Sequence, residues 1–219
     1  CSLILIVGSR LYLESFYAPF IRPEMRHDDA LFLDQPLNIV SGKWLGPIGD
    51  TTLIKGALFP LSLAFASILK VPYLVFQLGI TTICAIPAGL WLFQVSGRRL
   101  IVVVFALLTL INPLYFSQAG FLVIREWFYS SLCLLMLGSS LLAISQHTAQ
   151  KRRRVSLALL CLAAGLCSVT REENEFIYIY LLSSLFLYCR LGPFNTRRAI
   201  VLASAMALTA LPKVIVGGI

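Results

Sequence analysis

Charged residues are scarce in this chain. Only 13% of its 219 residues are Asp, Glu, Lys or Arg, while 58% are hydrophobic. In soluble proteins the charged share is about a quarter, because a water-facing surface needs charge. This composition excludes an ordinary soluble globular domain. The apolar residues gather in runs suited to membrane helices, so the sequence predicts a polytopic membrane protein.

Acidic residues are scarcer still, with 10 Asp and Glu against 18 Lys and Arg, which gives a formal net charge of +8. In a soluble domain this excess would suggest a nucleic-acid partner. Here the basic residues fall largely in short clusters between apolar runs, as the positive-inside rule requires of cytoplasmic loops. We therefore expect membrane lipids, and no nucleic acid, around this protein.

Cysteine spacing indicates neither a disulfide framework nor a zinc site. The six cysteines show no CxxC motif and no histidine at ligand spacing. Nearly all stand inside apolar runs, where a free thiol acts as a small hydrophobe. They are Cys1, Cys84, Cys133, Cys161, Cys167 and Cys189.

The apolar runs predict an all-α fold, a polytopic transmembrane bundle of about seven to nine helices that forms a single module over residues 1–219. The first run extends from Cys1 to about Phe20, and in it Arg10 and Glu14 are four residues apart, which suits an internal pair on one helix face. The later runs are Leu53–Leu69, Val71–Val95, Leu100–Phe116, Phe121–Ser145, Val155–Val169, Phe176–Tyr188 and Ala199–Ile219.

Residues 21–55 are too polar to span and form the first outer loop. Within them, Ala30–Val40 and Trp44–Ile48 keep enough Leu, Phe, Ile and Trp to lie flat on a membrane. We expect a structured loop with short amphipathic juxtamembrane helices in these two segments.

Three basic clusters in short loops without acids orient the bundle with those loops in the cytoplasm. Counting outward from them places residues 21–55, 117–126 and 170–175 on the outer side. To keep Arg98-Arg99 in the cytoplasm we expect Leu53–Leu69, which contains Pro60, to be only partly inserted, and a weakened charge bias is the alternative. The clusters are Arg98-Arg99, Lys151–Arg154 and Arg190 with Arg197-Arg198.

Two adjacent carboxylates, Asp28 and Asp29, stand in the outer loop at the expected lipid boundary. Neighbouring side chains on a helix or turn diverge, so one carboxylate can face a cavity while the other orients a metal or a cation. A partly desolvated carboxylate can also act as a general base. Two solvated loop acids are the alternative. With His27 beside them, Asp28 and Asp29 are the candidate ligands for a divalent cation, Mg²⁺ or Mn²⁺.

Cations at helix ends on the expected outer side need partners. Lys55, Arg125 and Arg171 hold such positions, where acids or an anionic ligand can pair with them. Basic side chains that converge with helix termini suit a phosphate or a diphosphate. The alternative is interfacial snorkelling, or pairing with the neighbouring acids. Those acids are Glu126, Glu172 and Glu173.

The outer loop resembles a known family. Asp28-Asp29-Ala30-Leu31-Phe32, Trp44-Leu45-Gly46-Pro47 and the stretch from Thr52 to Pro60 are similar to the N-terminal half of the GT-C glycosyltransferases. These polytopic enzymes use polyprenyl-phosphate-linked sugars, and they include the protein O-mannosyltransferases and the bacterial aminoarabinose transferases. Arg125-Glu126 and Thr170–Glu173 resemble blocks in bacterial members. The likeness covers roughly residues 1–190, through short and degenerate motifs.

The resemblance implies a role for each matching residue. Asp28 would be the base that activates the acceptor, and Asp29 would support it or help to hold the divalent metal. Lys55 would meet the donor phosphate, with Arg125 and Arg171 as further phosphate ligands. Gly56-Ala57 stands where the family has a proline, which leaves the direction of Lys55 open. Because the family's further C-terminal helices are missing, we expect a fragment of a longer protein.

From this resemblance we expect an inverting glycosyl transfer on the outer, periplasmic face of a bacterial cytoplasmic membrane. The donor would be a polyprenyl-phosphate sugar, and the acceptor an envelope glycan, lipid or protein. A transporter or flippase for an anionic lipid-linked substrate is one alternative, although the runs 71–95, 100–111 and 155–169 contain almost none of the polar residues it needs. A non-catalytic membrane subunit is the other, and the short chain favours it.

Overall fold

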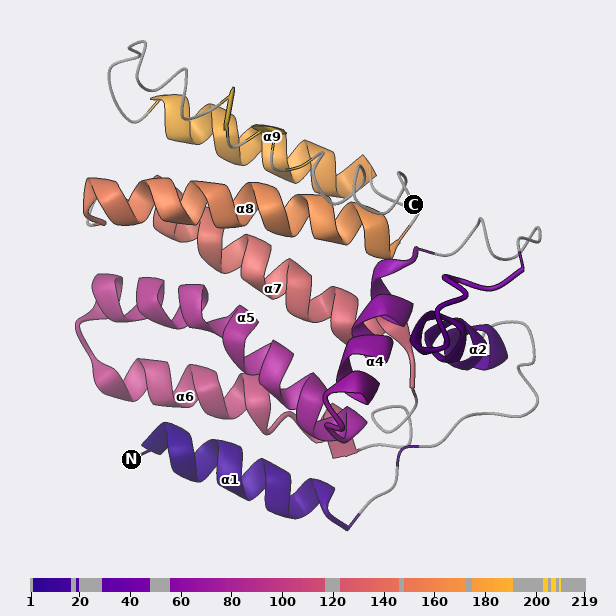
Figure 1. The fold of residues 1–219 in the computed structure, drawn as a ribbon. Helices are drawn as coiled ribbons and strands as arrows, with labels where there is room; N and C mark the ends of the chain where they lie inside the picture. The colour runs from indigo at the N-terminus through magenta and orange to yellow at the C-terminus, as the bar shows by residue number, and fades with distance from the viewer. Residues whose placement is uncertain are drawn as a thin grey trace. The chain divides into compact units, whose positions relative to one another are not determined.

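The computed structural model describes residues 2–16, 19, 29–47, 56–116, 123–145, 148–171, 175–190, and 203, 204, 206, 207 and 209. Within these ranges the chain forms eight α-helices and one 3₁₀-helix, and no strand (Figure 1). The helices are α1 (Ser2–Glu14), α2 (Asp29–Val40), α4 (Leu58–Ile68), α5 (Tyr73–Ser96), α6 (Arg99–Leu110), η1 (Pro113–Phe116), α7 (Arg125–Ile144), α8 (Gln150–Thr170) and α9 (Glu175–Arg190). The predicted all-α class is confirmed.

Three of these helices, α5, α7 and α8, are long and apolar enough to cross a membrane. This finding supports the membrane class. Of the seven to nine membrane helices predicted, it supports these three as spans. With 11 residues, α4 is about 16 Å long, against about 30 Å of bilayer hydrocarbon. The described part of α4 is too short to cross alone, in agreement with the partial insertion expected for Leu53–Leu69.

Several predicted boundaries were wrong, and local chemistry explains them. The first run was expected to reach Phe20, but α1 ends at Glu14, where the Ser15 hydroxyl donates to the Tyr12 carbonyl. The run expected over Leu53–Leu69 begins as a helix only at Leu58, and Pro60 fits in its first turn, where no backbone donor is needed. Pro113 stops α6 at Leu110, and the chain continues as the 3₁₀-helix η1.

Two segments have a secondary structure that differs from the one predicted. Lys151–Arg154 was placed in a loop but forms the start of α8, because Lys and Arg are good helix formers. Trp44–Ile48 was expected to be helical, yet Trp44–Pro47 is a turn. Gly42, Trp44 and Gly46 there have φ of 75°, 53° and 88°, which belong to the left-handed region and end a right-handed helix.

The contacts divide the chain into two compact units. Unit 1 comprises Cys1–Ile83 and Val103–Phe128, and unit 2 comprises Cys84–Val102 and Tyr129–Ile219. Because the boundaries fall inside α5, α6 and α7, the units are not consecutive segments of the sequence.

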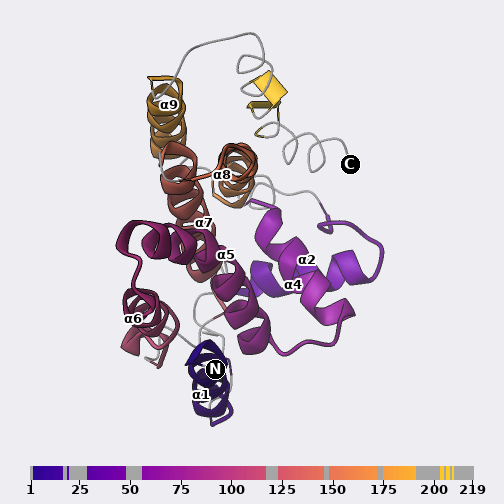
Figure 2. The same cartoon turned by 90° about the vertical axis from the view of Figure 1, so that its left-hand side faces the viewer.

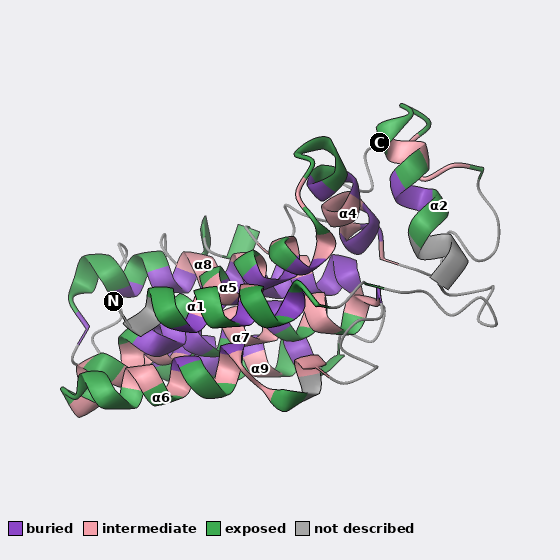
Figure 3. Ribbon diagram, turned by 90° about the horizontal axis from the view of Figure 1, so that it is seen from below, coloured by how far each residue is buried: buried purple, intermediate pink, exposed green. Residues whose placement is uncertain are grey.

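In unit 1, α1 packs against the first part of α5 and the last part of α6 through Ile6, Leu78, Ala106 and Leu110. In Figure 3, α1 and α6 are mostly green and pink with few purple positions, as expected of helices that pack along one side. A second contact joins Phe59 of α4 to Phe128, with ring centres 6.0 Å apart.

Helices α2 and α4 pack against each other in unit 1 (Figures 1 and 2). On α2, Leu33, Leu37 and Val40 are exposed at helical spacing along one face, while Gln35 is buried. An exposed apolar stripe is compatible with the surface position predicted for this segment, which stays a prediction.

In unit 2, α7 and α8 are antiparallel neighbours. At one end, Nε of Arg153 in α8 donates to the Ala143 carbonyl of α7 over 2.9 Å. At the other end, Arg171 lies over the ring of Tyr129. Helix α8 is lined by fully buried small and apolar residues and also contacts α9, so it is the centre of this unit. Small residues allow such close helix approach in membranes.

Candidate functional site

The predicted site falls largely on positions that the structure does not describe. Asp29 is the first residue of α2, but its side chain is outside the described set. Of the predicted site residues, the structure describes the side chains of Arg125, Glu126 and Arg171. The predicted site residues outside the described ranges are His27, Asp28, Lys55, Glu172 and Glu173.

Arg125 and Glu126 begin α7. The Nε of Arg125 lies 4.0 Å from Oε1 of Glu126, and their side chains are 18% and 52% exposed. A carboxylate in the first turn is favoured by the helix dipole. Beside them, Trp127 packs against Tyr115, with ring centres 4.6 Å apart. This geometry fits the alternative of a local ion pair next to an aromatic anchor, and such partly exposed pairs contribute little to stability.

Arg171 directly follows α8. Its backbone N–H donates to the Cys167 carbonyl over 3.1 Å, and its own backbone is extended, with φ −139° and ψ 144°. The guanidinium carbon lies 5.5 Å from the ring centre of Tyr129, within cation–π range. A positive charge here also complements the negative end of the α8 dipole. Helix α8 and Tyr129 together position this half-buried cation.

The opposite end of α7 and α8 carries a different set of cations. We call it the basic end, defined by Ala143, Thr148 and Lys151–Arg154. Of the four cations, Arg153 is buried, and its guanidinium carbon lies 5.3 Å from the ring centre of Tyr188. The Thr148 hydroxyl donates to Oε1 of Gln94 over 2.7 Å, which joins the last turns of α5 to this end. The basic cluster Lys151–Arg154 begins α8 and Arg171 directly follows it, so the length of the helix separates them.

A buried polar cluster in unit 1 lies outside the predicted site. The internal pair predicted in the first helix is confirmed, with Nε of Arg10 2.7 Å from Oε1 of Glu14 and side-chain exposures of 1% and 5%. Nη1 of Arg10 also donates to the Leu110 carbonyl over 3.2 Å. Its guanidinium carbon lies 4.0 Å from the ring centre of Tyr115.

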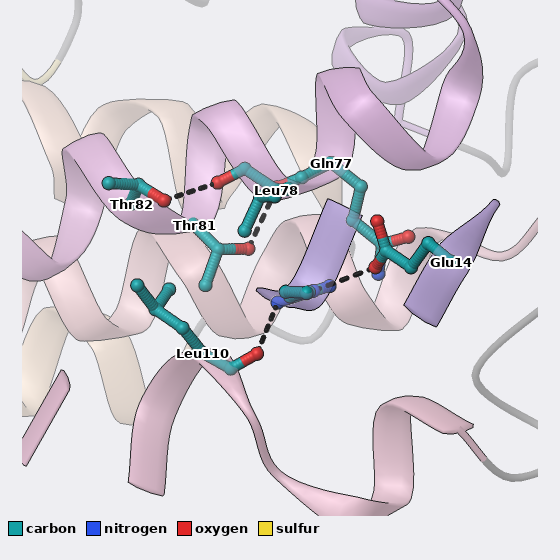
Figure 4. A network of polar contacts seen from close by, with 7 residues as sticks. Glu14, Gln77, Leu78, Thr81, Thr82 and Leu110 are labelled. Atoms are coloured by element: carbon teal, nitrogen blue, oxygen red, sulfur yellow. Dashed lines mark hydrogen bonds and ion pairs between the residues drawn. The ribbon is translucent and has the colours of Figure 1, made fainter. Parts of the chain in front are cut away.

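Gln77 of α5 extends this cluster and corrects the expectation that the run 71–95 is almost without polar residues. Its side chain is buried and points toward Glu14 (Figure 4). Among the residues that the structure describes, neither amide atom of Gln77 has a hydrogen-bond partner, and neither does Oε2 of Glu14. One turn on, the buried Thr81 hydroxyl donates to the Gln77 carbonyl over 2.9 Å. A Gln in an apolar run gave no signal that it would approach a carboxylate 63 positions earlier in the chain.

Metal binding stays a prediction. Among the residues that the structure describes, no group of three or more His, Cys, Asp and Glu side chains could hold a metal ion. The predicted cation ligands, Asp28 and Asp29, are not among the side chains described.

Comparisons with protein-family models, with curated proteins and with solved structures found no match for this chain.

Proposed function

We propose that this chain is a GT-C-type membrane glycosyltransferase module, which transfers a sugar from a polyprenyl-phosphate donor to an envelope glycan, lipid or protein on the outer face of a bacterial cytoplasmic membrane. The observation that supports it best is the position of Arg171. This cation stands at the end of a candidate span, opposite the basic end, and is held by an aromatic ring. Cations in such positions suit a lipid phosphate at the membrane surface.

The proposed chemistry is a single displacement with inversion. Asp28 accepts the proton of the acceptor hydroxyl as its oxygen attacks the anomeric carbon, and the bond from that carbon to the phosphate oxygen breaks. Arg171, with Lys55 and Arg125, stabilises the negative charge on the departing lipid phosphate. In a poorly solvated site such stabilisation lowers the barrier by several kcal/mol. Asp29, supported by Glu126, orients Asp28.

Donor binding by the purified full chain in detergent micelles tests the phosphate role. With a polyprenyl-phosphate sugar as ligand, Arg171→Ala should weaken binding about 10- to 100-fold, because a charge-assisted hydrogen bond contributes about 1.5–3 kcal/mol. Arg152→Ala is the matched control, since Arg152 is an exposed cation at the basic end. Equal affinities for the two variants would remove Arg171 from the site.

Transfer is tested separately, by incubating the chain with a panel of polyprenyl-phosphate sugars and acceptors and following loss of the sugar. Asp28→Asn should abolish turnover while donor binding remains. Normal turnover in this variant would refute the assigned base.

A transporter or flippase for an anionic lipid-linked substrate is a second candidate, because the buried cluster of Arg10, Glu14 and Gln77 places polar groups within the helices of unit 1. Polar groups in that position are what a substrate pathway requires. The two candidates differ in one assay. A fluorescent polyprenyl phosphate in proteoliposomes should stay in its leaflet if the chain is a transferase, and should cross in an Arg10-dependent way if it is a transporter.

A further inference from the structure

Two cysteines on neighbouring helices of unit 2 stand level with each other. Cys133 is one turn after Tyr129 in α7, Cys167 is one turn before Arg171 in α8, and Arg171 lies over the Tyr129 ring. Cys167 is fully buried and Cys133 is half-buried, and neither is in a disulfide. The antiparallel course of α7 and α8, fixed at the other end by Arg153 and Ala143, keeps the two thiols opposite each other.

The surroundings of this pair suit thiol chemistry. Arg171 lies over the ring of Tyr129, and Tyr129 is one turn from Cys133 on the same face of α7, so a positive charge stands close to Cys133. Arg171 also caps the turn that contains Cys167. The thiolate is the nucleophile in disulfide exchange, so nearby positive charge and a half-buried position single out Cys133 as the attacking group.

We propose that Cys133 and Cys167 form a redox-active dithiol that a small, membrane-permeant disulfide oxidises to a disulfide linking α7 to α8. The Cys133 thiolate attacks one sulfur of the small disulfide, a mixed disulfide forms, and one small thiolate leaves. Cys167, as thiolate, then attacks the Cys133 sulfur and expels the second small thiolate. The two protein thiols lose two protons and two electrons, and the small disulfide becomes two thiols.

A comparison within the same chain supports this assignment. Cys161 is in α8 and is as fully buried as Cys167, but it stands six residues earlier and so projects from another face of the helix. Geometry therefore favours the pair Cys133–Cys167 over a pairing of Cys133 with Cys161, because a disulfide needs two sulfurs that face each other.

The test uses the reduced full chain in detergent and 4,4′-dithiodipyridine, a small apolar disulfide that releases a coloured thiopyridone at each exchange. At the Cys133–Cys167 pair we expect two thiopyridones and a linked peptide in mass spectra, reversed by dithiothreitol. In Cys167→Ala, Cys133 should release one thiopyridone and keep a pyridyl adduct. That adduct should last at least about tenfold longer than in the unmodified chain, where an intramolecular thiol is at high effective concentration.

Cys161→Ala is the matched control and should close the Cys133–Cys167 link like the unmodified chain. Peptide mapping of the unmodified chain decides the proposal by itself, so a variant that misfolds does not prevent the test. Three results would overturn it: a lasting pyridyl adduct on Cys133 while Cys167 is present, a link from Cys84 to Cys167 instead, or no reaction at either Cys133 or Cys167.

Discussion

The guanidinium of Arg10 is almost fully buried, yet it has three partners. Glu14 balances its charge, the Leu110 carbonyl accepts one of its hydrogens, and the face of Tyr115 covers it. Leu110 is the last residue of α6, so its carbonyl accepts no hydrogen bond from within the helix. Arg10 therefore serves as a remote cap that ties α1 to the end of α6.

Removing Arg10 should cost more than removing the whole pair. In Arg10→Met, the Glu14 carboxylate stays buried without its cation, and we expect a loss of about 3–5 kcal/mol in the free energy of unfolding. Arg10→Met with Glu14→Gln should recover much of that loss. Denaturant unfolding in detergent, followed by circular dichroism, measures both variants. Arg98→Met, at an exposed cation, is the control and should change little.

Tyr129 should matter to donor binding through its ring. Replacing it by Leu removes the surface on which Arg171 rests, and a cation–π contact contributes about 0.5–2 kcal/mol. We expect Tyr129→Leu to weaken binding of the polyprenyl-phosphate donor about 2- to 30-fold. Tyr129→Phe keeps the ring and should bind like the unmodified chain. Equal loss in both variants would mean that the hydroxyl, and not the ring, sets the position of Arg171.

At this scale the sequence predicted what is local. The four-residue spacing of Arg10 and Glu14 predicted their ion pair, because residues i and i+4 share a helix face. The bond from Arg10 to Leu110 joins residues 100 positions apart, and it depends on how α1 meets α6. The level positions of Cys133 and Cys167 on neighbouring helices were missed for the same reason, since apolar spacing alone marks both as ordinary buried thiols.

At the scale of elements, one close approach joins α5 to α7 within unit 2. A Cβ added to Gly138 would clash with the backbone of Ala88. Close contact of this kind replaces the hydrophobic effect as a source of helix association in lipid, because lipid tails are as apolar as Leu.

Gly138→Ala should therefore destabilise the protein, by about 1–3 kcal/mol in the free energy of unfolding, as overpacked cores do. Gly79→Ala is the matched control, because Gly79 is exposed in α5 and has open space around it. That substitution should be neutral, or stabilising by up to about 1 kcal/mol, since Ala is the better helix former. Both are measured by denaturant unfolding. A neutral Gly138→Ala would contradict the close packing of α5 and α7.

Helix existence was predictable here, and helix ends were not. Long apolar runs identified α5, α7 and α8 because their composition exceeds what any loop requires. The start of α8 was missed because Lys151–Arg154 was interpreted by charge alone, although Lys and Arg also favour helices. The turn at Trp44 was missed because the apolar residues of Trp44–Ile48 were given more weight than Gly42 and Gly46-Pro47, which are turn signals.

At the scale of the molecule, the two ends of α8 carry the orientation of unit 2. Lys151–Arg154 begins the helix and Arg171 follows it, so a membrane-spanning α8 puts them on opposite sides. Arg98 and Arg99 follow α5, whose Gln94 is bonded to Thr148 at the basic end. Two of the three basic clusters used to orient the chain thus belong to one end of this unit, as the positive-inside rule expects of a common cytoplasmic side.

Labelling from one side of the membrane tests this orientation, and with it the location of the proposed site. Gln150 and Glu175 are exposed and flank the two ends of α8, so each can be replaced by Cys. In intact bacterial cells a membrane-impermeant maleimide should label Glu175→Cys, and should label Gln150→Cys only after permeabilisation. The unmodified chain gives the background from its native cysteines. Labelling of both variants in intact cells would mean that α8 does not cross. The reverse pattern would put Arg171 in the cytoplasm, where a donor phosphate on the outer leaflet is beyond its reach.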